Sequence, residues 1–269
     1  MISVSPQKTI RFLGVIIASL SLINLAVNFA RCFLGRGGLW GISRLFDLDI
    51  ENNIPTWYAS VTLLICAGLL ALITHRKRQQ GDRFMNHWRG LALIFLWLSM
   101  DEAASVHELF IDLNKPLQTT GFLHYAWVIP AMVILGILAV VYQKFVMALP
   151  QQVKRRFLLA ISLYVAGGLV LEMVGGQYKE VMNVQMPIAN GSGLAGMGMA
   201  LILAAEEMLE MSGVAVLIYT LLQMLSRESH GFHIAFGNLP RQAEPKVREP
   251  AISPSSDGRH SYASPQDER

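Results

Sequence analysis

Charged residues are scarce in this chain, and their scarcity limits what kind of protein it is. Asp, Glu, Lys and Arg make up 15% of its 269 residues, whereas about 25% is usual for soluble domains. Hydrophobic residues reach 53% of the sequence. A composition this apolar excludes most soluble classes and is expected of a protein whose surface faces lipid.

Cysteine is also rare, with Cys32 and Cys66 as the two examples. We expect Cys32 at the outer end of the first long apolar segment and Cys66 near the middle of the second. Because the two then lie at different depths, we expect no disulfide between them. Neither belongs to a Cys-x-x-Cys motif, which excludes the usual cysteine zinc sites and redox pairs. Both are therefore expected to be packing residues.

Strict alternation of apolar and polar residues, which is typical of membrane β-barrels, is missing. Long apolar runs take its place, at about residues 10–31, 55–75, 89–111, 123–147, 157–177 and 195–225. At about 1.5 Å per residue, roughly 20 helical residues cross the ~30 Å hydrocarbon layer of a bilayer. Since only helices and closed barrels can span a bilayer, the sequence predicts an all-α polytopic membrane protein with six transmembrane helices.

The first apolar run also resembles a secretory signal peptide, because Lys8 and Arg11 precede it. The run is longer than the apolar region of a signal peptide, and Arg31 with Cys32 makes a poor cleavage site. We therefore expect an uncleaved transmembrane helix.

The basic residues predict the orientation, since cytoplasmic segments of membrane proteins carry an excess of Lys and Arg. With the N-terminus inside, all but five of the 22 Lys and Arg residues fall in cytoplasmic segments; the five are Arg31, Arg36, Arg44, Lys115 and Lys179. Both termini are thus expected in the cytoplasm. The net charge of +3 reflects this bias, and since no basic and aromatic residues interleave along one face, we expect no nucleic-acid partner. The lipid bilayer is the expected partner, and a homo-oligomer is compatible with such a bundle.

The composition changes at about residue 238, where Pro, Ser and charged residues begin to dominate. Such a segment cannot bury enough apolar surface to fold. The sequence therefore predicts a six-helix transmembrane domain over residues 1–237 and a disordered cytoplasmic tail over 238–269.

Seven carboxylates lie inside the apolar runs. A carboxylate at the bilayer centre costs about 2.5–3.5 kcal/mol on insertion scales, so such groups usually face the bundle interior, pair with one another and mark a site. At about 100° per residue, the three in the last run share one face, and all of them are expected in the middle or outer half of the bilayer. We predict that they form one pocket: Asp101, Glu102, Glu108, Glu172, Glu206, Glu207 and Glu210.

Three interpretations of this pocket remain open. Carboxylates this close do not all ionise unless a cation is present, so the group favours a proton relay or a small-cation site, used for binding or transport. A membrane-embedded metal-dependent enzyme is the alternative, with a divalent metal ion as cofactor and with His107 and His124 as added ligands. Its diagnostic Glu-x-x-His spacing is missing, since Glu102 and His107 are five residues apart. The third interpretation is a polar network that only fixes helix packing.

Two further patterns concern how the helices pack. Gly167, Gly168, Gly175 and Gly176 fall on one side of the fifth run, where small residues let another helix approach closely. Acid pairs about 12 residues into the third and sixth runs are also compatible with a 3+3 inverted repeat, which is typical of transporters.

The segments ENNIPTWYAS, LSMDEAASVHE and EEMLEMSG resemble a family of bacterial multi-pass inner-membrane proteins of uncharacterised function. The resemblance covers most of residues 40–225 and leaves out the tail. It implies a bacterial origin and a location in the inner (plasma) membrane, and it implies no activity.

Overall fold

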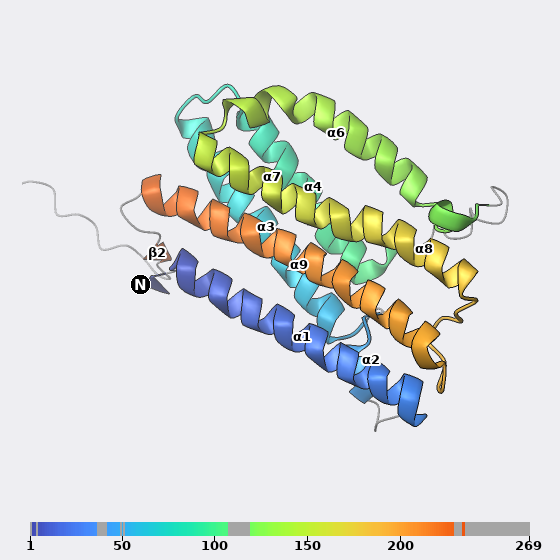
Figure 1. Cartoon of the computed structure of the whole chain (residues 1–269). Helices are drawn as coiled ribbons and strands as arrows, with labels where there is room; N and C mark the ends of the chain where they lie inside the picture. The colour runs from blue at the N-terminus through green and yellow to red at the C-terminus, as the bar shows by residue number, and fades with distance from the viewer. Residues whose placement is uncertain are drawn as a thin grey trace, which may run out of the picture. The chain divides into compact units, whose positions relative to one another are not determined.

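The computed structural model describes residues 2–3, 5–36, 42–48, 50, 52–106, 119–228 and 233–234. These residues form an all-α bundle (Figure 1), with a pair of two-residue strands, β1 (Ile2–Ser3) and β2 (His233–Ile234), that run antiparallel. The helices are α1 (Pro6–Leu34), α2 (Ile42–Phe46), α3 (Ile54–Gln79), α4 (Met85–Ala104), η3 (Gly121–Leu123), α6 (Val128–Ala148), α7 (Gln151–Val165), η4 (Ala166–Leu171), α8 (Glu172–Val181) and α9 (Gly193–Glu228).

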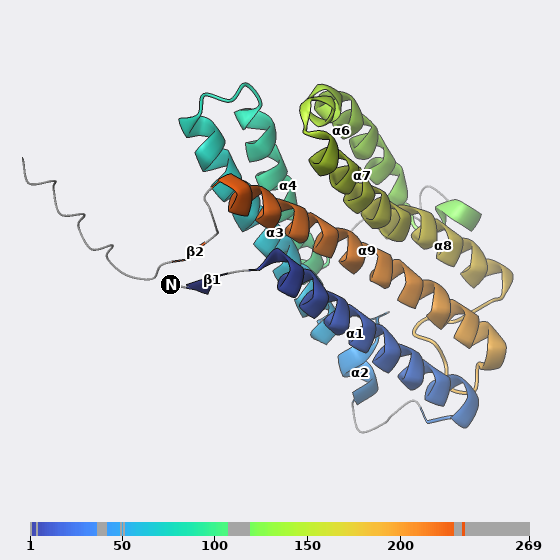
Figure 2. The same ribbon diagram turned by 60° about the vertical axis from the view of Figure 1, so that its left-hand side comes forward.

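The longest helix, α9, holds the bundle together. It packs against α1, α3, α7, η4 and α8, and Figure 2 shows it running between α1 and the α7–α8 stretch. Its inward side carries Ile218, Leu221 and Leu225, all with less than 3% of their surface exposed. Leu70 of α3 and Phe157 of α7 belong to the same core. The α3–α4 hairpin therefore meets the rest of the bundle largely through α9.

Among the described residues, four helical stretches are long and apolar enough to cross a membrane: α1, α3, α6 and the continuous stretch Gln151–Val181. On α6 the apolar side chains point outward, and Val133, Ile137 and Val140 are 59%, 58% and 75% exposed. Exposed apolar faces of this size are expected where a helix contacts lipid. The chain thus has the helices of a membrane protein.

The sequence predicts one continuous helix over the third apolar run, but the helix there, α4, ends at Ala104. It ends there because Ser105 adopts a left-handed backbone conformation with φ 52°. The expected fourth helix likewise begins later, at Val128, after the short helix η3. His107, Glu108 and the tail at 238–269 lie outside the described residues.

A buried ion pair joins the C-terminal end of α1 to the segment that follows it. Arg31 Nη2 lies 2.7 Å from Asp47 Oδ2, and the two side chains are 8% and 1% exposed. Arg31 also donates to Asn28 Oδ1 at 3.2 Å, and Asn24 Nδ2 donates to the Phe46 carbonyl at 3.1 Å. Arg31 is therefore a buried residue that ties the end of α1 to the end of α2, whereas the sequence predicts that it lies in an outside loop.

Replacing Asp47 with Ala should lower the free energy of unfolding by about 3–5 kcal/mol, because it leaves the Arg31 guanidinium buried without its partner. Thermal unfolding in detergent measures the effect. The double variant Arg31→Met/Asp47→Leu removes both charges and should recover most of the loss, whereas Arg36→Ala, at an exposed position, should change little. An unchanged melting temperature for Asp47→Ala would show that the pair does not anchor α2.

Candidate functional site

A π-helical segment interrupts the helical stretch Gln151–Val181 near its middle. This segment, η4, covers Ala166–Leu171 and ends directly before Glu172. π turns widen a helix locally and are frequent at functional sites. The segment carries Gly167 and Gly168, so the widened turn presents bare backbone to its neighbour.

Glycines bring η4 and α7 into backbone contact with α9. A Cβ added at Gly167 would lie 2.7 Å from both the Glu206 carbonyl oxygen and Glu210 Cγ. The contact is reciprocal, since a Cβ at Gly213 would lie 2.7 Å from the Ala160 carbonyl oxygen. Any larger residue would force the helices apart. The expected close approach is confirmed at Gly167, and Gly168 meets the Glu210 carboxyl group in the same way.

This contact brings the carboxyl groups of Glu172 and Glu206 within hydrogen-bonding reach of each other. Glu206 is 8% exposed, so water does little to solvate its charge. A carboxylate only accepts hydrogen bonds, and a bond between two carboxyl groups therefore needs a proton on one of them. A hydrogen bond between Glu172 and Glu206 would thus place a shared proton between them.

Aromatic side chains are placed to donate hydrogen bonds to two of the carboxyl groups, those of Glu172 and Glu210. Trp127 Nε1, at the start of α6, donates to Glu172 Oε1 at 3.2 Å. The Tyr164 hydroxyl, on α7, lies within hydrogen-bonding reach of the Glu210 carboxylate. An indole N–H can only donate, so Glu172 must offer an oxygen lone pair there.

The charges of neighbouring carboxylates extend the group to α4. Glu207, Glu102 and Glu172 act electrostatically on Glu210, and Asp101 acts on Tyr164. We call these residues the acidic cluster: Asp101, Glu102, Glu172, Glu206, Glu207 and Glu210. Six of the predicted site residues, on α4, α8 and α9, thus lie within electrostatic range of one another or of Tyr164. Glu108 lies outside the described residues.

The early end of α4 adds to the negative potential. Asp101 and Glu102 lie in the last turn of this helix, which ends at Ala104. The carbonyl end of a helix carries a partial negative charge, so carboxylates there are unfavourable unless a positive charge or a proton offsets them.

The candidate metal ligand His124 contacts Glu180, which lies outside the acidic cluster. Its Nδ1 lies 2.6 Å from Glu180 Oε1, and the Gly121 N–H donates to Glu180 Oε2 at 2.7 Å. The other candidate, His107, lies outside the described residues. Within the described ranges, no group of three or more His, Cys, Asp and Glu side chains is arranged to hold a metal ion.

Sequence reasoning missed Trp127, Tyr164 and the π turn. Trp127 stands at the start of an apolar run, where an aromatic residue usually marks the membrane interface. Tyr164 lies in the apolar stretch before Glu172, and its hydroxyl needs a partner when buried. A tyrosine within an apolar stretch therefore indicates a buried hydrogen bond, but the sequence does not identify the acceptor.

Comparison with known proteins assigns the chain to a family. No curated protein and no solved structure matches the chain. A family model described as a domain of unknown function, DUF8692, matches residues 12–225, a range that includes α4, η4, α8 and most of α9. The acidic cluster lies entirely inside the matched range. The chain therefore belongs to the DUF8692 family.

Proposed function

We propose that this protein crosses a bacterial inner membrane and uses its acidic cluster to bind and relay protons. The observation that carries the proposal is that the carboxyl groups of Glu172 and Glu206 lie within hydrogen-bonding reach of each other. Chains of buried carboxyl groups are the usual carriers of protons within membranes. A small cation such as Na⁺ is the alternative guest, because it would offset the same negative charge.

The proposed topology has six spans, with both termini in the cytoplasm. The two further spans are α4, with 20 residues, and α9, with 36. Arg76 at the end of α3 donates to the Leu225 carbonyl of α9 at 3.2 Å, and Arg227 donates to Gln152 at the start of α7 at 2.8 Å. β1 before α1 pairs with β2 after α9. These contacts support one shared basic end of the bundle, which the excess of Lys and Arg would hold in the cytoplasm.

The geometry favours a proton over a directly bound divalent metal. Trp127 and Tyr164 both offer hydrogen-bond donors to the cluster, and a donor cannot ligate a metal through its hydrogen. The neighbours of Glu172 and Glu210 thus suit carboxyl groups that gain and lose protons. A metal-dependent enzyme would require additional ligands at this site.

Replacing Glu206 with Gln should abolish proton flux through the purified protein in vesicles, because the amide keeps the shape of the side chain but cannot carry the shared proton. A pH-sensitive dye inside the vesicles, with a potential applied across the membrane, measures the flux. Glu180→Gln is the matched control, since Glu180 is exposed and hydrogen-bonded to His124 outside the cluster. It should leave the flux unchanged.

Two results would contradict this function. Wild-type flux in Glu206→Gln would show that the shared proton is not on the path. If neither the wild type nor the variant carries protons or Na⁺, and the substitution only lowers the melting temperature, the cluster is a packing network. Stoichiometric bound metal that is lost in Glu206→Gln would instead favour the enzyme.

Reporter fusions test the topology. A reporter that is active only in the cytoplasm should give signal after Arg78, Arg156 or Arg241 and none after Lys115, because the basic ends are retained inside. Signal after Lys115 would contradict the six-span arrangement.

A further inference from the structure

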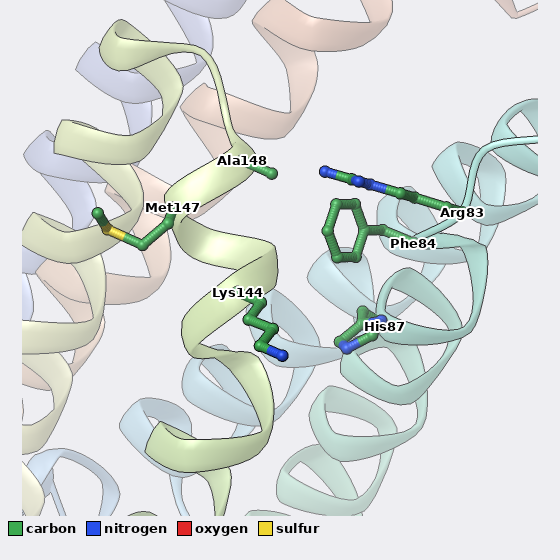
Figure 3. A pocket seen from close by; sticks show the side chains of 6 residues that line it. All are labelled: Arg83, Phe84, His87, Lys144, Met147 and Ala148. Atoms are coloured by element: carbon green, nitrogen blue, oxygen red, sulfur yellow. The ribbon is translucent and has the colours of Figure 1, made fainter.

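A basic cavity of about 520 Å³ lies between the start of α4 and the end of α6. Figure 3 shows the side chains that line it: Arg83, Phe84, His87, Lys144, Met147 and Ala148. Arg83 precedes the first turn of α4, whereas Asp101 lies in its last turn. At about 1.5 Å per residue, they are roughly 27 Å apart along the helix axis. The cavity is therefore separate from the acidic cluster.

Aromatic contacts join α4 and α6 beside the cavity. The His87 ring stacks on Phe145 with the ring centres 5.6 Å apart, and it makes T-shaped contacts with Phe84 and Tyr142 at 5.3 and 5.4 Å. The Tyr142 hydroxyl donates to the His87 carbonyl at 3.2 Å. These contacts pack the two helices against each other next to the cationic side chains.

Two cations line the cavity. The Arg83 guanidinium lies 4.6 Å from the centre of the Phe84 ring, and Lys144 points from α6 toward His87 (Figure 3). Both side chains are exposed, and no carboxylate within the described ranges forms an ion pair with either of them. The cavity thus offers positive charge to an anion.

Apolar surface continues from the cavity along both helices. Met147 in the cavity wall is 67% exposed, and Val140 and Ile137, further along α6, are 75% and 58% exposed. On α4, Leu93 is 59% exposed. Of the side chains on α6, Val128 and Phe145 are buried against the protein. A ligand with a charged head and apolar chains would match this surface along its whole length.

We propose that the cavity binds the headgroup of an anionic phospholipid. Its phosphate lies between Arg83 and Lys144, and its acyl chains follow the exposed apolar face of α6. Arg suits a phosphate because its planar guanidinium offers paired donors. Basic pockets between transmembrane helices, near their ends, bind lipid headgroups on the cytoplasmic side. The lipid would seal α6 against α4 where the protein itself provides few buried side chains.

Lipid titration followed by native mass spectrometry of the full-length protein in detergent tests this site. Phosphatidylglycerol should bind more tightly than phosphatidylcholine with the same acyl chains. The double variant Arg83→Gln/Lys144→Gln should weaken phosphatidylglycerol binding by about 10- to 30-fold, as expected from removing two cations near an anionic lipid. Lys144→Gln alone, at an exposed position, should weaken it by a smaller factor and provides the test if the double variant does not fold.

Matched controls separate a built site from general charge attraction. Arg78→Gln/Arg155→Gln removes two exposed cations that do not line the cavity, and it should leave the affinity unchanged. Glu206→Gln should also leave it unchanged, because the lipid site does not depend on the proposed proton relay. Equal binding of the two lipids, an equal loss in the Arg78/Arg155 variant, or equally tight binding of inorganic phosphate would each overturn the proposal.

Discussion

Backbone contact between η4 and α9 determines where the carboxyl groups meet. Gly167 of η4 faces backbone atoms of Glu206 and Glu210 on α9, and Gly213 of α9 faces backbone atoms of Ala160 and Tyr164 on α7, so neither glycine separates the helices with a side chain. Because α8 continues directly from η4, the same contact sets Glu172 opposite Glu206. The acidic cluster therefore depends on glycine at positions that carry no chemistry themselves.

The two ends of α4 carry opposite charge. Asp101 and Glu102 in its last turn belong to the acidic cluster, whereas Arg83 before its first turn lines the basic cavity. Unpaired charge is costly inside a membrane, so the proposed function would have these carboxyl groups share protons and accept hydrogen bonds inside the bundle. In the same proposal the cations near the start of α4 would lie within reach of lipid phosphates.

Much of this arrangement follows from the sequence, because long apolar runs predict helices and carboxylates within them predict a shared interior site. Described carboxylates of the third, fifth and sixth runs act electrostatically on Glu210 or Tyr164, and their convergence on one pocket stays a prediction. The end of α4 at Ala104 could not be predicted, since the apolar run continues to residue 111 while Ser105 turns the chain. The π turn and the donors Trp127 and Tyr164 also depend on tertiary contacts, as does the pairing of Arg31 with Asp47.

Infrared spectroscopy of the purified protein in lipid can detect the proposed proton between Glu172 and Glu206. A protonated carboxyl group has a carbonyl band that is distinct from the bands of carboxylates and amides. The account predicts such a band at neutral pH, with a shift after exchange into D₂O and a loss or displacement in both Glu172→Gln and Glu206→Gln. A wild-type spectrum at neutral pH without a protonated carboxyl band, or a band that neither substitution changes, would contradict it.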